Sequence, residues 1–186
     1  MSVSVPLSVA TQESLVDQFF QLCHGNWHSQ RRYYTLKDGT AEEVVSRLSV
    51  RYLAPDAPEL VQLAQMHQVP IVGFFGCGAI TTWNSQYTGA AGKQTTGSTV
   101  FGVQGTRLYR DRGFATPNPV TATFEMADAK TMRLRTEYNG SVFEEEIKLI
   151  GAHYRTRQTL ISRRGEEQMI GQYLERRLPD SLAPLA

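Results

Sequence analysis

The sequence predicts a single domain made almost entirely of β-strands, and a closed antiparallel barrel of about ten strands is the architecture we expect. Along most of the 186 residues, β-branched and aromatic residues alternate with polar ones, as they do in strands with two unlike faces. Turn signals rich in glycine, proline, asparagine and aspartate interrupt this alternation at short intervals. A chain of this length fits one domain.

Two segments, 11–23 and 58–68, have helical periodicity instead, because their apolar residues recur every three or four positions. Thr11 is the candidate N-cap of the first helix. Asp56 and Glu59 have the spacing of a capping box for the second helix. Residues outside the barrel, in the ranges 1–10 and 179–186, are expected to form flexible tails.

The strand pattern begins with Asn26 to Leu36, continues through a hairpin signal at Lys37 to Thr40, and resumes from Val44 to Leu53. Later turn signals divide the rest of the chain into strands of similar length. These signals are Gly89 to Gly92, Gly105, Asp111 to Gly113, Pro117 to Pro119, Asp128, Asn139-Gly140 and Gly165. Short strands at such regular spacing are typical of a sandwich or a barrel.

The first strand favours the barrel. Neither of its two faces is wholly apolar, because one holds Trp27, Ser29, Arg31, Tyr33 and Thr35 and the other holds His28, Gln30, Arg32, Tyr34 and Leu36. A mixed face of this kind suggests a cavity that holds an amphipathic, anionic ligand. An ordinary surface strand, with its rings half-buried and its arginines in water, explains the same pattern, and both interpretations stay open here.

Composition excludes several classes of protein. Nineteen basic and eighteen acidic residues leave a net charge of +1, without the basic excess that nucleic-acid binding requires. Cys23 and Cys77 lack the spacing of a zinc site or a disulfide framework, and the four histidines are scattered, so we expect no metal. No apolar run is long enough for a signal peptide or a membrane span, which indicates an intracellular protein in a reducing compartment.

The densest cluster of polar residues runs from Glu144 to Thr159. On the strand pattern, Glu145 faces opposite to its neighbours Glu144 and Glu146. Arg155 and Arg157 share one face of the next strand. Glu145 and these arginines could line a pocket together, or they could form a salt-bridge ladder on the outer surface.

Several ordered motifs resemble those of the S-type (CpcS/CpeS) phycobiliprotein chromophore lyases. The resemblance covers the chain from about Phe19 to Leu178. The motifs that carry it are Gly25-Asn26-Trp27-His28-Ser29-Gln30-Arg31, Thr95-Thr96-Gly97-Ser98-Thr99-Val100, Leu108-Tyr109-Arg110-Asp111-Arg112-Gly113-Phe114, Thr136-Glu137-Tyr138-Asn139-Gly140-Ser141, Phe143-Glu144-Glu145-Glu146-Ile147 and Arg155-Thr156-Arg157-Gln158-Thr159.

The resemblance implies a lipocalin-like or fatty-acid-binding-protein-like up-and-down barrel with a helix across one mouth. Such a lyase binds a linear tetrapyrrole such as phycocyanobilin without a covalent bond and transfers it to a cysteine thiol of a phycobiliprotein subunit, which forms a thioether. The bilin is then a substrate, with no permanently bound cofactor. The implied location is the cytoplasm of a cyanobacterium or the stroma of an algal plastid. Whether a homodimer or a related lyase subunit takes part stays open.

The family's bilin site maps onto particular positions of this chain. Glu145 and Arg155 are the implied catalytic residues. The implied substrate-binding residues are Trp27, Arg31, Trp83, Arg155 and Arg157. Tyr34 replaces a histidine expected from the family, and this departure bears on which bilin is preferred.

Two rival functions use the same expected fold, since fold alone does not decide function. A non-enzymatic carrier of a fatty acid or another small carboxylate could use the same arginines. An assembly chaperone could recognise apo-phycobiliprotein and hold no pigment.

Overall fold

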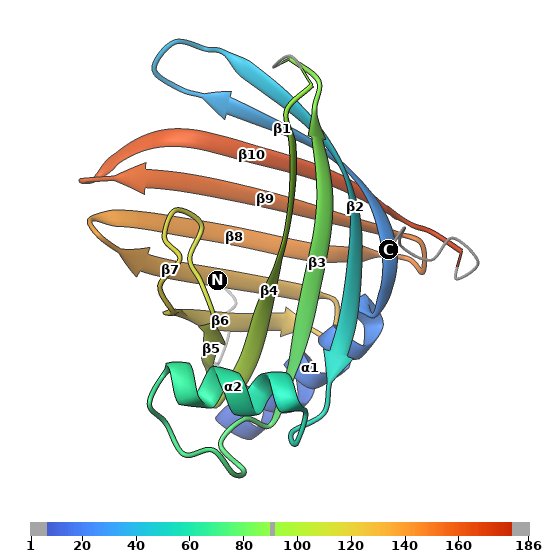
Figure 1. The fold of residues 1–186 in the computed structure, drawn as a ribbon, viewed down its shortest axis with the longest axis vertical. Coiled ribbons are helices and arrows are strands. Elements are labelled where there is room, and N and C mark those ends of the chain that lie inside the picture. Colours follow the sequence, from blue (N-terminus) through green and yellow to red (C-terminus); the bar gives the residue numbers. More distant parts are fainter. Residues whose placement is uncertain (1–6, 90–91, 180–186) are drawn as a thin grey trace, which may run out of the picture.

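Ten antiparallel strands close into one barrel within residues 7–89 and 92–179, the part of the chain that the computed structural model describes (Figure 1). The strands are β1 (Gly25–Thr35), β2 (Ala41–Leu53), β3 (Cys77–Tyr87), β4 (Gln94–Gln104), β5 (Arg107–Arg110), β6 (Val120–Asp128), β7 (Thr131–Tyr138), β8 (Ser141–Ile150), β9 (Tyr154–Arg163) and β10 (Glu166–Arg177). The predicted fold class is confirmed.

The topology is up-and-down, because each strand pairs with the next one along the chain and β10 returns to pair with β1. The β1–β10 register runs from Trp27 opposite Arg177 to Thr35 opposite Met169. Full closure leaves no unpaired edge. Since side chains alternate along a strand, every second residue points into the barrel.

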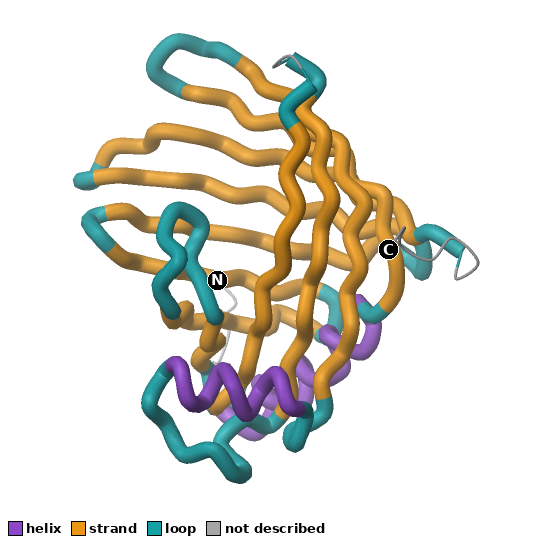
Figure 2. Tube along the Cα trace, in the orientation of Figure 1, coloured by secondary structure: helices purple, strands orange, loops and turns teal. Residues whose placement is uncertain are grey.

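Helix α1 (Val9–Cys23) covers one end of the barrel, opposite the loops that join β1 to β2 and β9 to β10 (Figure 2). It buries Val16, Phe19, Phe20 and Cys23. The predicted N-cap is wrong: Ser8 is the cap, and its hydroxyl accepts a hydrogen bond from the Thr11 amide at 3.3 Å. Residues 9 and 10, expected in a tail, therefore belong to the helix, whereas residues 1–6 and 180–186 of the expected tails lie outside the described ranges.

Helix α2 (Pro58–Met66) packs on the outside of the barrel against β4. The capping box expected for it is absent, because Ala57 is the N-cap and Glu59 pairs with Arg51 instead. Gly78 of β3 lets this helix lie close to the sheet, since a Cβ there would be 2.6 Å from a Leu60 methyl. None of the described helices is long and apolar enough to cross a membrane.

Candidate functional site

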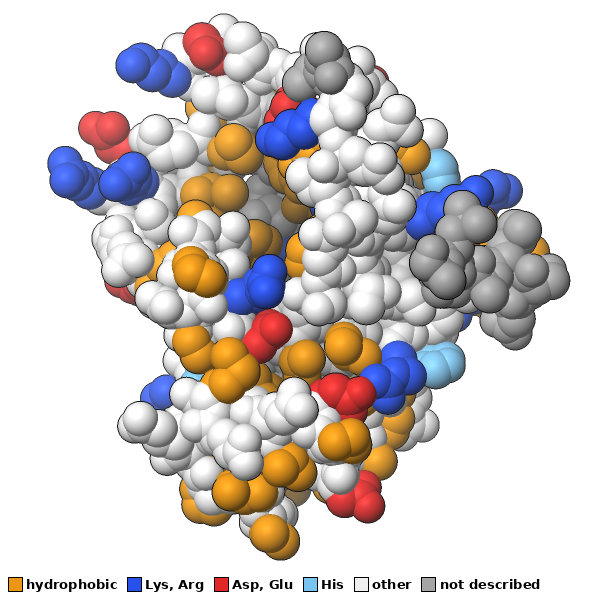
Figure 3. All heavy atoms as spheres, viewed as in Figure 1, with side chains coloured by type: hydrophobic (Ala, Val, Ile, Leu, Met, Phe, Trp, Pro, Cys, Tyr) orange, Lys and Arg blue, Asp and Glu red, His pale blue; other side chains and the backbone are white. Residues whose placement is uncertain are grey.

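The barrel encloses a cavity of about 540 Å³, which is bounded at one end by α1. This volume is within the range of small-molecule sites. Figure 3 shows the surface hollowed beside β4, with hydrophobic side chains inside the hollow. One wall of the cavity is largely apolar. Its main residues are Phe19, Phe20, Leu48, Val50, Ala79, Trp83, Phe101, Leu108, Met132, Leu134 and Ile147.

The opposite wall is polar and comes from β1, β10 and β9, which lie side by side. The strand register arranges its side chains in three cross-strand rows. Ser29, Glu175 and Arg155 form the row nearest α1. Arg31, Tyr173 and Arg157 form the middle row, and Tyr33, Gly171 and Thr159 form the row nearest the hairpin turns. The inward alternation of these strands thus gathers the polar groups on one side of the cavity.

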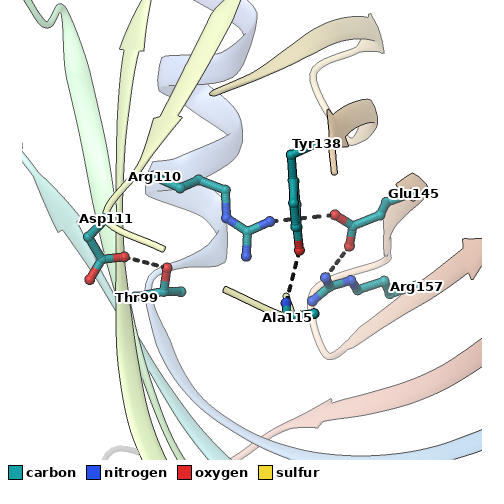
Figure 4. A network of polar contacts seen from close by, with 7 residues as sticks. All are labelled: Thr99, Arg110, Asp111, Ala115, Tyr138, Glu145 and Arg157. Carbon is teal, nitrogen blue, oxygen red and sulfur yellow. Dashed lines mark hydrogen bonds and ion pairs between the residues drawn. The ribbon is translucent and has the colours of Figure 1, made fainter. Parts of the chain in front are cut away.

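A buried ion pair joins Glu145 of β8 to Arg157 of β9. The Glu145 side chain is 1 % exposed, and Arg110 of β5 approaches its other oxygen at 4.0 Å (Figure 4). Burial lowers the pKa of Arg110, and the negative charge of Glu145 partly offsets that effect. The acidic residue predicted from the sequence therefore lies inside the barrel, between two guanidiniums.

A second buried ion pair joins Arg155 of β9 to Glu175 of β10. Burial alone would raise the pKa of Glu175, but the positive charge of Arg155, assisted by Arg157 and Arg31, outweighs it and lowers the pKa. One of the two arrangements left open by the strand pattern placed Arg155 and Arg157 against a single carboxylate, Glu145. In the structure each arginine has a different carboxylate partner.

The charged groups in and around the cavity do not balance. Five arginines line the cavity, and one of them, Arg112 at the mouth, is half-exposed and lies 4.0 Å from Asp111. The other four guanidiniums belong to Arg31, Arg110, Arg155 and Arg157, whereas the buried carboxylates among the described residues are Glu145 and Glu175. The surplus is two positive charges. Within the described chain, Arg31 has no carboxylate within 4.0 Å, and its Nε contacts the Ser29 hydroxyl at 3.4 Å. A dianionic ligand would balance this surplus.

Trp83 lines the apolar wall at a position that depends on Gly97. The two residues are opposite each other on β3 and β4, and a Cβ on Gly97 would be 2.5 Å from the indole ring. The missing side chain at residue 97 thus leaves room for the ring to lie over β4. Trp83 is one of the predicted binding residues that face the cavity, with Arg31, Arg155 and Arg157.

Trp27 occupies a different place from the one expected for a ligand-stacking ring. It is fully buried at the α1 end of the barrel, where the guanidiniums of Arg155 and Arg177 lie 4.7 and 4.3 Å from the centre of its ring. Its indole N–H donates to the Cys23 carbonyl at the end of α1. Trp27 therefore supports Arg155 and the helix and does not contact the cavity.

The segment 111–119, between β5 and β6, lies over the mouth of the cavity, and its residues 112–117 line the mouth. Phe114 stacks on Phe143 with ring centroids 4.8 Å apart, and Tyr138 stacks on Phe143 at 5.0 Å. The Ala115 amide donates to the Tyr138 hydroxyl at 2.9 Å. We call residues 111–119 the mouth loop.

Sequence reasoning missed Arg110, Tyr173, Glu175 and the mouth loop as parts of the site. Arg110 and Phe114 were inside a motif that received no chemical role. Tyr173 and Glu175 follow the inward alternation of β10. The alternation with period two that identified Arg155 and Arg157 on β9 could also have identified Tyr173 and Glu175 on β10.

Both cysteines are buried, and burial raises the pKa of Cys23 and raises that of Cys77 to about 12. Cys23 lines the cavity beside Arg155. Among the described residues, no group of three or more histidine, cysteine or acidic side chains could hold a metal ion.

A barrel with a helix across one end and a two-sided internal cavity defines a lipocalin-like ligand-binding protein. The family model described as "CpeS-like protein" matches residues 15–178. The chain belongs to the CpeS-like family.

Relatives named as chromophore lyases are similar to the chain over nearly their whole length. "Putative phycocyanobilin lyase CpcS 2" of a Nostoc species is 54 % identical over 89 % of this chain and 92 % of the relative. "Putative chromophore lyase CpcV" of a Picosynechococcus species is 48 % identical over 94 % and 88 % of the two chains. The solved structure of the S-type phycobiliprotein lyase CPES from Guillardia theta, 20 % identical, covers 94 % of this chain and 99 % of its own with a TM-score of 0.76, which supports the fold.

Proposed function

We propose that the protein is a chromophore lyase that binds a bilin in its barrel and attaches it to a cysteine of a phycobiliprotein subunit. Membership of the CpeS-like family and the lyase names of the two relatives described above support this activity. A bilin such as phycocyanobilin is the proposed substrate, and an apo-phycobiliprotein subunit in the cytoplasm is the proposed acceptor.

The surplus of two positive charges in the cavity is the observation that carries the proposal. A bilin has two propionates on one edge of an otherwise flat, largely apolar molecule. The polar wall of β1, β9 and β10 suits that edge, and the apolar wall with Trp83 suits the pyrrole rings. A fatty acid would balance only one charge and would leave most of the polar wall without a partner.

The reaction is an addition in which the acceptor thiol adds across a carbon–carbon double bond of the bilin. A C–S bond forms, the S–H bond breaks, and the thiol proton ends on the bilin, so no oxidant is required. The lyase contributes by holding the bilin in one geometry and away from water.

We assign different roles to Glu145 and Arg155. Arg155 binds a propionate, with Arg31 and Arg157 as further anchors. When a propionate binds Arg157, Glu145 loses one of its two guanidinium partners and one oxygen becomes available to a pyrrole N–H. A carboxylate at that position favours the protonated and more electrophilic tetrapyrrole.

Two measurements test the function. The purified protein is mixed with phycocyanobilin, and a shifted visible spectrum is expected on binding. An apo-phycobiliprotein subunit is then added, and pigment that stays with the subunit after denaturation shows thioether formation. A subunit with its acceptor cysteine replaced by serine is the control. An unshifted spectrum would contradict bilin binding, and a shifted spectrum without transfer would favour a carrier.

A further inference from the structure

Tyr33 and Tyr173 form a hydroxyl pair inside the cavity that the roles above leave unused. Their hydroxyl oxygens are 3.1 Å apart, and the rings meet edge to face with centroids at 5.8 Å. Both residues line the cavity. In such a pair one hydroxyl donates to the other, so one O–H remains to donate to a ligand.

The surroundings of the pair are cationic. The guanidiniums of Arg31 and Arg157 lie 5.5 and 5.0 Å from the centre of the Tyr173 ring. Burial raises the pKa of Tyr173 above its usual range, which keeps its hydroxyl protonated at neutral pH. A neutral O–H donor beside two guanidiniums is suited to an anionic oxygen.

Thr159 supplies an independent observation that a ligand belongs here. It lines the cavity, is 2 % exposed, and its hydroxyl has no hydrogen-bond partner among the described residues. The register places Thr159 beside Gly171, which is opposite Tyr33. Since buried hydroxyls are ordinarily hydrogen-bonded, a ligand oxygen is the natural partner for Thr159.

Gly171 leaves the space that the two rings occupy. A Cβ at residue 171 would be 3.1 Å from the Tyr173 ring and 3.2 Å from the Tyr33 ring. The rings thus lie over the backbone of β10, with their hydroxyls in contact. Arg31 is opposite Tyr173 on the neighbouring strand, and its guanidinium lies 5.5 Å from the centre of the Tyr173 ring.

We propose that Tyr33 and Tyr173, with Arg31, form a carboxylate site that binds one propionate of the bilin and makes the tyrosine pair a specificity-determining element. This inference rests on the proposed function, because it names the substrate group that the polar wall recognises. Arg31 supplies the charge, and the tyrosine hydroxyls and Thr159 fix the orientation of the carboxylate.

The test compares phycocyanobilin with its dimethyl ester, which keeps the rings and removes both negative charges. Tyr173→Phe and Tyr33→Phe keep the ring packing and delete one hydroxyl each. We expect each variant to bind the free acid about tenfold more weakly than the unsubstituted protein does, and to bind the ester as well as that protein does. Because the two hydroxyls act as a unit, the double variant should bind the free acid no more weakly than the single variant that has the lower affinity.

Tyr154→Phe is the matched control, since Tyr154 is 45 % exposed on the outer face of β9. Circular dichroism and the midpoint of thermal unfolding report whether each variant is folded. Unchanged affinity of both folded tyrosine variants for the free acid would overturn the inference, as would an equal loss for acid and ester. If the unsubstituted protein leaves the spectrum of phycocyanobilin unshifted, the proposed function itself fails, and that outcome is separate from the other two.

Discussion

Glu145 of β8 pairs with Arg157 of β9 inside the barrel, and its second oxygen faces Arg110. The Nε atoms of both arginines are buried without a hydrogen-bond partner among the described residues. Glu145 is therefore the group that compensates two cations in a poorly hydrated place. Its charge matters for stability as well as for the bilin.

Glu145→Gln should lower the free energy of unfolding by about 1–3 kcal/mol, because Arg110 and Arg157 lose their shared anion. The bilin should still bind, but with a blue-shifted, less protonated spectrum and slower transfer. Urea unfolding, a spectral titration and a transfer assay measure these effects. Glu144→Gln is the control, since Glu144 pairs with Arg135 on the outer surface at 2.9 Å. Equal behaviour of the two variants would show that Glu145 has no special role.

Arg155→Leu should destabilise the protein by about 3–5 kcal/mol, because it leaves Glu175, 2 % exposed, as an unpaired buried carboxylate. Bilin binding should also weaken, by about tenfold to a hundredfold, if Arg155 anchors a propionate. Adding Glu175→Gln should restore stability but leave the bilin affinity low. Recovery of affinity together with stability would argue against a direct contact.

The ion pair between Arg155 and Glu175 predicts that the free energy of unfolding falls at acid pH. The folded pKa of Glu175 is lowered from an ordinary value of 4.5. Its contribution to stability is therefore complete above pH 4.5 and is lost as the pH falls through the lower, folded pKa. Unfolding free energies measured between pH 3 and pH 7 should show this loss, and Glu175→Gln should flatten it. An unchanged slope in that variant would contradict the assignment.

The barrel could be predicted because the period of two in the sequence is also the period that directs side chains inward. Trp27, Ser29 and Arg31 share one face, as expected, and the structure shows that this face is the inner one. The helix starts were harder to predict, since several polar residues near each start could cap it. Ser8, and not Thr11, is the N-cap of α1, and Glu59 forms an ion pair with Arg51 instead of a capping box.

Which arginine pairs with which carboxylate inside the site could not be predicted from the pattern of each strand taken alone. Arg155 and Arg157 are equivalent in the pattern of β9, yet Arg155 pairs with β10 and Arg157 with β8. Which neighbour an inward side chain meets depends on register and barrel closure, and these are properties of the whole sheet. Trp27 illustrates the same limit: it points inward, but it lies so close to the end of α1 that it does not line the cavity.

Substitutions of the two tryptophans should have different effects, one mainly on bilin affinity and the other mainly on the free energy of unfolding. Trp83→Phe removes part of the surface that faces the cavity, so bilin affinity should fall about three- to tenfold with little loss of stability. Trp27→Phe should lower the free energy of unfolding by about 1–3 kcal/mol, because part of the fully buried indole and its hydrogen bond to the Cys23 carbonyl are lost. Affinity of the folded Trp27 variant should stay close to that of the unsubstituted protein. A larger affinity loss at Trp27 than at Trp83 would reverse these roles.

The double variant Cys23→Ser, Cys77→Ser should retain transfer, since the attacking thiol belongs to the acceptor and burial keeps both thiols neutral. Pigment transfer is measured beside circular dichroism and bilin titration. Cys23 lines the cavity, so a covalent intermediate on it is the informative alternative. Lost transfer with intact folding and bilin binding would favour that intermediate.

Tyr138→Phe should loosen the mouth loop without disturbing the cavity. The substitution keeps the stack of Tyr138 on Phe143 but removes the hydroxyl that accepts from the Ala115 amide. A single neutral hydrogen bond contributes about 0.5–1.5 kcal/mol, so the open loop should become up to about tenfold more populated. Bilin association and dissociation, followed by stopped-flow absorbance, should then both accelerate while the dissociation constant changes little. Tyr154→Phe is again the control, and unchanged rates in the Tyr138 variant would show that the bilin enters without moving this loop.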